Sequence, residues 1–294
     1  MRVTPGGYLV SEIFELLKSL GETSLQSREI FSTETRDKSN LNVWRDTVSG
    51  VIYIDDYYCG ETFYSEGEYK DQNIRSNLDR EYDTERRITQ YRAYYTDKNI
   101  VDFGCGTGDF LRTSKGKTRK YAGIELQKSY REALNKEGIS CYSDLSPIDF
   151  KIDTLFLFHT LEHFENPLDI LVSIRTKLSP GSALIVEVPH ANDFLLNNLN
   201  CKSFKKFTLW SPHLILHTRS SLHKILTAAG FQVDIIEGIQ RYPLSNHLGW
   251  LSTQAPGGHK TSLNAIDTQL LTAAYEASLQ KIDSTDTLVA RASV

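Results

Sequence analysis

The sequence has few cysteines, and they lie far apart. Four cysteines occur in 294 residues, Cys59, Cys105, Cys141 and Cys201, and no two of them form a Cys-x-x-Cys pair. This spacing indicates neither a cysteine-rich zinc site nor a disulfide framework. We therefore expect a protein of the reducing cytoplasm.

Long hydrophobic runs and a strong charge of one sign are also lacking. The apolar runs 155–158 and 183–188 are far shorter than the ~20 residues of a membrane span. The first 20 residues carry Glu12 and Glu15, whereas a signal peptide has an uncharged core. Lys and Arg number 33 against 37 Asp and Glu, a net charge of −4. We therefore expect neither a membrane nor a nucleic acid as partner, because a surface that binds a polyanion needs excess basic residues.

Short apolar runs alternate with helical stretches from residue 99 onward. The runs are 100–103, 121–124, 139–142, 154–158, 183–188 and 231–236. Between them, Asn166-Pro167 is typical of a helix start, with asparagine as the cap, and Thr218 can cap a later helix. The alternation predicts an α/β fold in which helices cover a parallel sheet.

The two ends of the chain lack this alternation. Residues 1–98 are rich in tyrosine and begin with an amphipathic helical pattern, and a hairpin is predicted around 43–54. Residues 246–294 contain a helical stretch and then a polar tail from Ser284. We therefore predict an N-terminal cap at 1–98, a central ligand-binding domain at 99–245 and a C-terminal extension at 246–294.

A glycine-rich turn follows the first predicted strand, at residues 102–108 (Asp-Phe-Gly-Cys-Gly-Thr-Gly). Glycines at such a turn let the backbone approach a ligand closely. Glu125 ends the next strand, where its carboxylate can accept from both hydroxyls of a ribose, and Asp144 ends the third, where it can accept from an adenine amino group. No Lys-Ser/Thr pair follows the glycines, which excludes a P-loop, and Asp109 stands where a dinucleotide fingerprint needs glycine. The charge of Asp102 suits a ligand with an ammonium and a sulfonium better than a pyrophosphate.

These motifs, in this order, resemble those of class I S-adenosylmethionine-dependent methyltransferases. The resemblance covers residues 99–236 and includes the turn at 158–164 (Phe-His-Thr-Leu-Glu-His-Phe). It implies a Rossmann-like, seven-stranded, mostly parallel sheet with helices on both faces, flanked by the N-terminal cap and a C-terminal helical addition. It also implies S-adenosylmethionine as the cofactor. The predicted cofactor-binding residues are Asp102, Gly104, Cys105, Gly106, Gly108, Glu125, Asp144, Phe158 and His159.

Histidines are the candidates for proton transfer, since methyl transfer to a protonated acceptor needs a positioned base that titrates near neutrality. The resemblance places His159 and His163 in the floor of the cofactor and substrate cleft. His213 lies in a segment that resembles a Glu-His-Leu motif of the family, with Pro212 in the place of the glutamate. We take His213 as the first candidate base, followed by His159 and His190, although a structural role is equally open for each.

Residues of the predicted cap supply candidates for binding the acceptor. Tyr64 and Tyr69 flank a glycine in a predicted loop, and together with His163 they are the predicted substrate-binding residues. Arg86 and Arg87 belong to a helical stretch before the first strand. They can bind a carboxylate or phosphate, or they can lie on a solvated helix face.

The expected acceptor is a small molecule, and the sequence does not indicate the oligomeric state. The hairpin at 44–52 and the Pro-Gly-Gly-His segment at 256–259 resemble family members associated with sugars and surface polysaccharides, which implies a sugar or nucleotide-sugar. Two alternatives stay open: a cofactor-binding protein without catalysis, and a zinc hydrolase, because 159–163 matches His-x-x-Glu-His. Zinc ligation by that motif needs both histidines on one helix, whereas His159 directly follows a predicted strand. We therefore expect no metal ligands.

Overall fold

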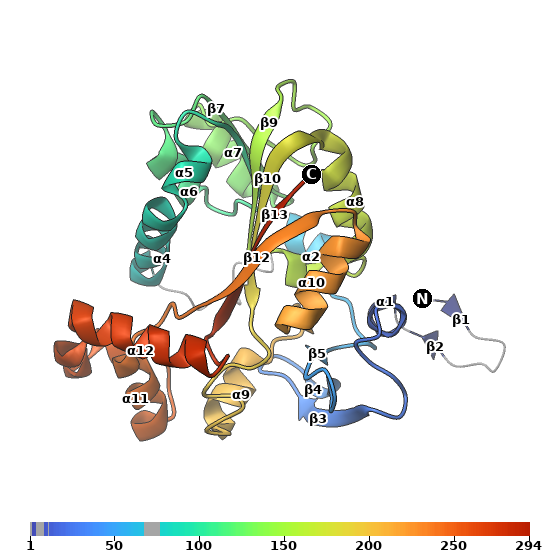
Figure 1. Ribbon diagram of the computed structural model, residues 1–294, viewed down its shortest axis with the longest axis vertical. Helices are drawn as coiled ribbons and strands as arrows, with labels where there is room; N and C mark the ends of the chain where they lie inside the picture. The colour runs from blue at the N-terminus through green and yellow to red at the C-terminus, as the bar shows by residue number, and fades with distance from the viewer. Residues whose placement is uncertain (1, 4–8, 11, 68–76) are drawn as a thin grey trace.

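A seven-stranded sheet forms the centre of the computed structural model, which describes residues 2–3, 9–10, 12–67 and 77–294 (Figure 1). In spatial order its strands are β12 (Gln232–Ile239), β13 (Thr287–Ser293), β10 (Leu178–Pro189), β9 (Ile152–Phe158), β6 (Asn99–Phe103), β7 (Lys120–Ile124) and β8 (Cys141–Tyr142). Neighbours from β10 to β8 pair in parallel, and β13 pairs antiparallel with both β10 and β12. This sheet confirms the predicted Rossmann-like α/β fold.

Helices cover both faces of the sheet, because successive residues of its central strands point to opposite sides. Val101 and Leu155 belong to the hydrophobic core on one face, whereas Ile100 and Phe156 belong to the core on the other. The first face is covered by α8 (Pro167–Lys177) and α10 (Arg219–Ala228), and the second by α5 (Arg92–Tyr95), α6 (Asp109–Ser114) and α7 (Lys128–Lys136). Figure 1 shows the two sets of helices on either side of the strands.

Local sequence signals set where the covering helices begin. Thr218 forms a capping box at α10: its hydroxyl oxygen accepts from the Ser221 backbone nitrogen at 3.3 Å, and the Ser221 hydroxyl oxygen accepts from the Thr218 backbone nitrogen at 2.9 Å. Pro167 occupies the first turn of α8 as predicted. Asn166 occupies the predicted N-cap position of α8, but its side chain makes no capping hydrogen bond, because its amide donates to the carboxylate of Glu12 instead.

A smaller antiparallel sheet packs its own core. It consists of β11 (Ile215–Leu216), β5 (Ile52–Tyr53), β4 (Ser39–Asp46) and β3 (Arg28–Glu34). Trp44 pairs with Tyr53 across the turn, and Gly50 in that turn has a φ of 76°, so the predicted hairpin at 43–54 is confirmed. Because β11 comes from the predicted central domain, the N-terminal part and the segment around Ile215 share one hydrophobic core.

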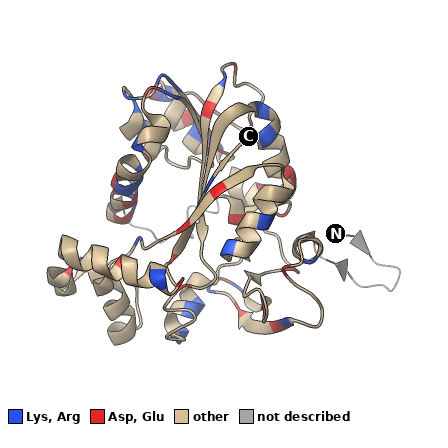
Figure 2. Ribbon diagram, in the orientation of Figure 1, with Lys and Arg blue, Asp and Glu red and all other residues tan. Residues whose placement is uncertain are grey.

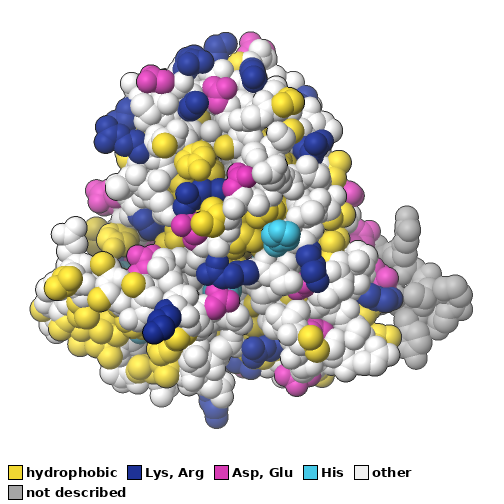
Figure 3. Space-filling model, viewed as in Figure 1, with side chains coloured by type: hydrophobic (Ala, Val, Ile, Leu, Met, Phe, Trp, Pro, Cys, Tyr) yellow, Lys and Arg dark blue, Asp and Glu magenta, His cyan; other side chains and the backbone are white. Residues whose placement is uncertain are grey.

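The remaining elements surround these two sheets. They are β1 (Arg2–Val3), β2 (Leu9–Val10), α1 (Glu12–Ser19), α2 (Glu61–Ser65), α4 (Asn77–Gln90), η1 (Leu161–His163), α9 (Lys202–Thr208), α11 (Leu244–Thr253), η2 (Gly258–Lys260), η3 (Ser262–Ile266) and α12 (Gln269–Lys281). In the described part of the chain, no helix combines the length and the apolar character needed to cross a membrane. On the face shown in Figure 3, hydrophobic side chains gather at the lower left, over α11 and α12.

The end of the chain belongs to the central sheet. The polar tail predicted from Ser284 is therefore wrong from Thr287 onward, where β13 pairs with β10 on one edge and with β12 on the other. Leu288 and Val289 on this strand are fully buried. The segment predicted as a C-terminal extension, 246–294, thus supplies a strand to the sheet, while the division of the chain into domains stays a prediction.

A buried carboxylate fixes α4 to the sheet. Glu187 in β10 is 0% exposed, and it accepts from Arg86 at 2.9 and 3.0 Å, from Arg87 at 2.9 Å and from the Tyr91 hydroxyl at 2.7 Å. Burial raises the pKa of this carboxyl, but the guanidinium groups of Arg87 and Arg86 outweigh it and hold the pKa well below its usual range. The two arginines therefore bind a carboxylate of the chain itself, and the prediction that they lie on a solvated face is wrong.

A second carboxylate extends this cluster to the end of the chain. Asp83 lies on α4, which carries both signs of charge (Figure 2), and it pairs with Arg86 at 2.6 Å and with Arg241 at 3.4 Å. Arg241 follows β12 and pairs with Asp286, directly before β13, at 3.4 Å. These ion pairs join α4 to three neighbouring strands of the sheet, β10, β12 and β13. We call the residues that take part the Glu187 cluster: Asp83, Arg86, Arg87, Tyr91, Glu187, Arg241 and Asp286.

We predict that Glu187→Gln lowers the free energy of unfolding by about 3–5 kcal/mol, because it leaves two mostly buried guanidinium groups without their shared anion. Urea denaturation at pH 7 measures the change. The control is Glu137→Gln, which removes an exposed partner of Arg112 and should leave the midpoint nearly unchanged. Equal losses in the two variants would contradict the central place of the Glu187 cluster.

We also predict that the contribution of Glu187 to the free energy of unfolding depends on pH. The folded-state pKa of Glu187 lies below its ordinary value of 4.5, so its contribution to stability is fully present above pH 4.5 and is lost as the pH falls below it. The difference in unfolding free energy between the wild type and Glu187→Gln should therefore shrink between pH 5 and pH 3. Urea titrations across this range test it, and a difference that grows on acidification would refute the assignment.

Candidate active site

The glycine turn after β6 forms a tight loop at the carboxyl edge of the sheet. Gly104, Gly106 and Gly108 have φ angles of 78°, 53° and 78°, a region that favours glycine. The backbone nitrogens of Gly104 and Cys105 both donate to the carbonyl of Ile124, at 2.8 and 3.0 Å. These bonds fasten the loop to the end of β7.

Glu125 connects this loop to the next one. Its Oε2 accepts from the backbone nitrogen of Gly106 at 2.8 Å, and its Oε1 accepts from that of Gln127 at 2.8 Å. Burial raises the pKa of the Glu125 carboxyl, and these two backbone donors oppose the rise. Because each carboxylate oxygen has two lone pairs, both oxygens keep acceptor capacity for a pair of ligand hydroxyls.

The three glycines of the loop differ in what surrounds them. A Cβ atom at Gly104 would lie 2.4 Å from Thr160 Oγ1, and one at Gly108 would lie 2.4 Å from a methyl carbon of Leu134. A Cβ atom at Gly106 meets no atom within 4 Å. Gly104 and Gly108 are therefore required by packing, whereas Gly106 borders open space.

Asp102 provides a buried acceptor beside the loop. It is 3% exposed, and its Oδ1 has no hydrogen-bond partner in the described part of the chain. Burial raises its pKa to about 7, with Arg87 opposing the rise. A buried acceptor without a donor costs free energy, so Asp102 fits a ligand with a cationic donor, and the ammonium of S-adenosylmethionine is such a group.

Two further predicted cofactor residues also lie near the loop or the strand ends. Phe158 ends β9, where its ring stacks on Tyr91 with 5.7 Å between centroids and the Arg87 guanidinium lies 4.3 Å from its centroid. The sulfur of Cys105 lies 3.7 Å from that of Cys141 in β8. Phe158 is therefore tied to the Glu187 cluster, and Cys105 is tied to the edge strand.

Asp144 lies after β8 and is exposed. Its carboxylate accepts from the backbone nitrogen of Ser146 at 2.8 Å and from the hydroxyl of Ser143 at 3.1 Å. The bonds from Ser146 lower the pKa of Asp144. The carboxylate thus orders its own turn and is ionised at neutral pH.

Four ring side chains from three segments form a wall that we call the aromatic cluster: Tyr64, His163, Trp210 and His213. The ring centroids of His163 and His213 are 4.9 Å apart, and Trp210 lies 6.1 Å from the first and 5.1 Å from the second. The Tyr64 hydroxyl lies 3.4 Å from His163 Nδ1. The structure therefore brings together Tyr64, His163 and His213, which the sequence singles out, and adds Trp210, for which the sequence carries no signal.

His159 lies at the turn between β9 and η1. It has a φ of 51°, and its Nδ1 lies 3.3 Å from the Glu162 carboxylate. Because His159 precedes η1 (Leu161–His163), it does not share a helix with His163, and the zinc-peptidase arrangement is absent from this turn. Burial raises the pKa of Glu162 to about 8, so this carboxyl holds its proton at neutral pH in the metal-free chain.

The last two predicted residues fall elsewhere. His190 is 1% exposed, and its Nδ1 donates to the Thr285 carbonyl at 3.0 Å while its Nε2 lies 3.9 Å from Asp283. Burial lowers its pKa. None of these contacts is with the aromatic cluster. Tyr69 lies outside the described residues.

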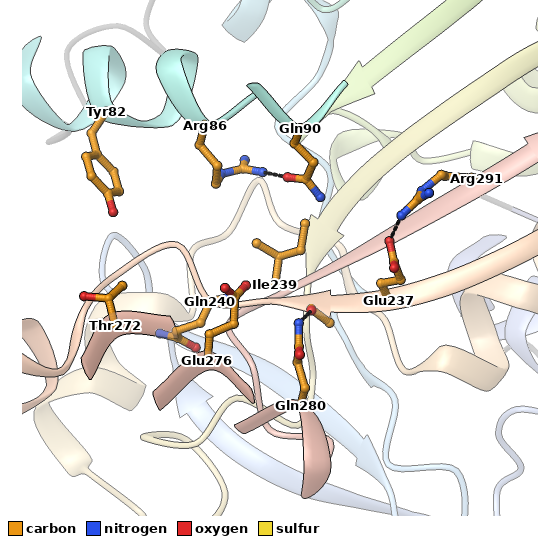
Figure 4. A pocket seen from close by; sticks show the side chains of 11 residues that line it. Tyr82, Arg86, Gln90, Glu237, Ile239, Gln240, Thr272, Glu276, Gln280 and Arg291 are labelled. Carbon is orange, nitrogen blue, oxygen red and sulfur yellow. Dashed lines mark hydrogen bonds and ion pairs between the residues drawn. The ribbon is translucent and has the colours of Figure 1, made fainter. Parts of the chain in front are cut away.

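A hollow of about 320 Å³ lies between α4, β12 and α12 (Figure 4). Arg86 and Gln90 reach into it from α4, and Glu276 and Gln280 reach into it from α12. Of the residues that the sequence singles out, Arg86 lines this hollow, where its guanidinium is already bound to Glu187; the predicted cofactor-binding residues and histidines do not line it. The glycine loop and the aromatic cluster are therefore the candidate active site.

The fold and the glycine loop define the class of this protein, a Rossmann-like enzyme that binds a nucleoside-containing cofactor. The family model described as "Methyltransferase domain" matches residues 75–235, more than half of the chain. The chain belongs to this family. The S-adenosylmethionine-dependent methyltransferase class and the cofactor, which the sequence motifs implied, are thereby confirmed.

Two relatives are similar over parts of their length. A tRNA U34 carboxymethyltransferase of Colwellia psychrerythraea is 25% identical over 114 residues, 34% of this chain and 35% of that protein. A ubiquinone biosynthesis O-methyltransferase of Aeromonas salmonicida is 25% identical over 182 residues, 54% of this chain and 73% of that protein. The chain thus spans about a third of the length of the first of these relatives.

Solved structures share the fold. A SAM-dependent methyltransferase from Archaeoglobus fulgidus is 18% identical with a TM-score of 0.51, over 73% of this chain and 94% of that one. A SAM-dependent methyltransferase from Thermotoga maritima, titled a possible histamine N-methyltransferase, is 16% identical with a TM-score of 0.50, over 79% and 96%. At these identities the likeness concerns the architecture only.

We predict that Gly104→Ala is more destabilising than Gly116→Ala. Both positions have a positive φ, 78° and 84°, so both variants incur a backbone cost of about 1–2 kcal/mol. Only the first also places its Cβ against Thr160, a β-branched side chain with little freedom to move, because a Cβ at Gly116 meets no atom within 4 Å. Urea denaturation of the two variants checks this, and equal losses would show that the loop is not packed as described.

Proposed function

We propose that this chain transfers the methyl group of S-adenosylmethionine to a small-molecule acceptor. The observation that carries the proposal is the opening at Gly106, bordered by the Glu125 carboxylate 2.8 Å from the Gly106 nitrogen. Bound there, S-adenosylmethionine supplies an electrophilic methyl group on a sulfonium. The chain's own task is then to bind, to orient and to exclude water.

The proposed cofactor contacts follow the chemistry of each side chain. Asp102 binds the ammonium, and the backbone of the loop at 104–108, including Cys105, lies along the methionine end. Glu125 exchanges part of its bonding to Gly106 for the two ribose hydroxyls, and Asp144 accepts from the adenine amino group. Phe158 and His159, at the end of β9, close the remaining side.

The acceptor is proposed to bind against the aromatic cluster. Tyr64, His163 and Trp210 supply flat apolar surface together with polar ring atoms, which suits a small molecule with both characters. A sugar or nucleotide-sugar acceptor is the specific proposal, and it rests on the family resemblance of the segments 44–52 and 256–259. In the structure His259 of the second segment lies 2.9 Å from Asp79 of α4, so this segment also positions the helix beside the cleft.

A histidine is proposed to accept the acceptor's proton. His213 is the first candidate, because it belongs to the aromatic cluster. Burial lowers its pKa, which keeps the ring neutral at pH 7 but also makes it a weaker base. His159 is the second, at the turn after β9. His190 is the third, and its buried contacts with Thr285 and Asp283 favour a positioning role.

Calorimetric titration tests the cofactor site. We predict that wild-type protein binds S-adenosylmethionine but not NAD, that Glu125→Ala weakens binding about 10- to 100-fold, and that Gly106→Arg abolishes it. The first loss corresponds to hydrogen bonds to a charged group, worth about 1.5–3 kcal/mol. Glu137→Ala is the control: it removes an exposed carboxylate directly after α7, and this variant should bind S-adenosylmethionine as the wild type does. Unchanged binding by Glu125→Ala would remove this residue from the site.

Turnover with a panel of acceptors tests the reaction. We predict that methyl transfer requires a small hydroxylated acceptor and that Tyr64→Ala raises KM more than it lowers kcat, because the residue contacts the acceptor. Transfer is measured as S-adenosylhomocysteine released. Cofactor binding without transfer to any acceptor would favour the alternative of a cofactor-binding protein without catalysis.

A further inference from the structure

The aromatic cluster and the turn before it bring together one carboxylate and two imidazoles. Glu162, His163 and His213 each offer one ligand atom, and these atoms lie within 4.8 Å of one another. The two segments that carry them are tied by the backbone, since the Leu214 nitrogen donates to the Glu162 carbonyl at 2.7 Å. The His213 nitrogen donates to the Trp210 carbonyl at 2.8 Å, which orders the second segment. The grouping is therefore a built feature of the fold.

The hydrogen bonding of His163 favours one tautomer. Its Nδ1 lies 3.0 Å from the carbonyl oxygen of Pro212, so Nδ1 donates its proton to that oxygen. A neutral imidazole with its proton on Nδ1 carries a lone pair on Nε2. Histidines that ligate metals in proteins commonly donate their other ring N–H to a backbone carbonyl in this way.

The carboxyl group of Glu162 is buried without hydrogen bonds to its oxygens in the described part of the chain. The residue is 0% exposed. The His159 ring lies beside it, with Nδ1 3.3 Å from Oε1. A buried carboxyl group without hydrogen bonds is costly, and a divalent cation that displaces its proton would provide a counter-charge and coordinate its oxygens.

We propose that Glu162, His163 and His213 bind a divalent transition-metal ion. Two imidazole nitrogens with one carboxylate oxygen suit Zn²⁺ or Mn²⁺, whereas Mg²⁺ and Ca²⁺ prefer oxygen ligands throughout. Three protein ligands leave coordination positions open to water or to another oxygen. The set differs from the His-x-x-Glu-His motif of the sequence, because His213, 54 residues further along the chain, takes the place of His159, and the proposal departs from the expectation of no metal ligands.

The ion gives the acceptor site a second function, and this part rests on the proposed methyl transfer. It lies next to the aromatic cluster, where it binds an oxygen of the acceptor, lowers the pKa of that hydroxyl and fixes its direction. His213 then acts as a ligand, and the proton of the acceptor hydroxyl passes to His159, the second candidate base, which lies beside Glu162. The acceptor is accordingly of a class that offers at least one hydroxyl to a metal ion.

Metal binding is measured first on the wild-type chain. Protein stripped with EDTA and dialysed is titrated with Mn²⁺ or Zn²⁺ by calorimetry, and bound metal is counted by elemental analysis. We expect one ion per chain and a higher melting temperature in its presence, since an ion that binds only the folded state stabilises it. No bound ion, or an ion that leaves the melting temperature unchanged, would overturn the proposal without any variant.

Variants then locate the ion. Glu162→Gln and His213→Ala should lower the affinity at least 10-fold, whereas His223→Ala, which removes an exposed histidine on α10, should bind as the wild type does. The visible spectrum of bound Co²⁺ gives a second readout, because loss of a nitrogen ligand changes its bands. Equal affinity in Glu162→Gln and wild type would place the ion elsewhere and overturn the assignment.

Titration with S-adenosylmethionine separates this proposal from the function on which its role rests. An ion bound by Glu162 and His213 in a chain that binds no S-adenosylmethionine would support the metal site and overturn the proposed methyl transfer. Methyl transfer that continues undiminished in metal-free protein would overturn the role of the ion in catalysis.

Discussion

The carboxylate of Glu187 is the interaction on which the arrangement of the cleft depends. It lies near the end of β10, an inner strand of the sheet, and it accepts from Arg86 and Arg87 of α4 and from the hydroxyl of Tyr91. Arg87 in turn lies over the ring of Phe158, at the end of the strand that leads into the histidine turn. Because two mostly buried guanidinium groups tolerate little displacement from their anion, α4 and the end of β9 are held in one fixed relation. The ion pairs thus join the helix before the first strand to the end of the strand that leads into the histidine turn.

Much of the fold could be predicted from the sequence, because its signals are local. The glycine turn, the strand ends at Glu125 and Phe158, the hairpin at 43–54 and the cap at Thr218 depend on neighbouring residues. The last strand, Thr287–Ser293, was not recognised, because its apolar run is brief and polar residues lie at both of its ends; in the structure it pairs with β10 and β12. The pairing of Glu187 with Arg86 and Arg87 spans about a hundred residues and leaves no pattern in the sequence.

The residues of the candidate site likewise fall into two groups: those that local sequence patterns predict and those that only tertiary packing brings together. Gly106 and Glu125 could be predicted as site residues because each follows a strand with a recognisable pattern. In the structure the Gly106 backbone nitrogen donates to the Glu125 carboxylate at 2.8 Å. The meeting of His163 with His213 and Trp210 results from the path of residues 209–216 across the smaller sheet, which local patterns do not encode. The burial of Glu162 has the same origin. A sequence motif can therefore suggest that a histidine is important, whereas its partner is set by tertiary packing.

The central claim is that the glycine loop and Glu125 bind the cofactor, and a crystal structure of the chain with S-adenosylhomocysteine tests it most directly. The account predicts density over Gly106, with both ribose hydroxyls bonded to the Glu125 carboxylate and the ammonium bonded to Asp102. Ligand density elsewhere, for example in the hollow between α4 and α12, or an unoccupied loop at saturating ligand, would contradict it.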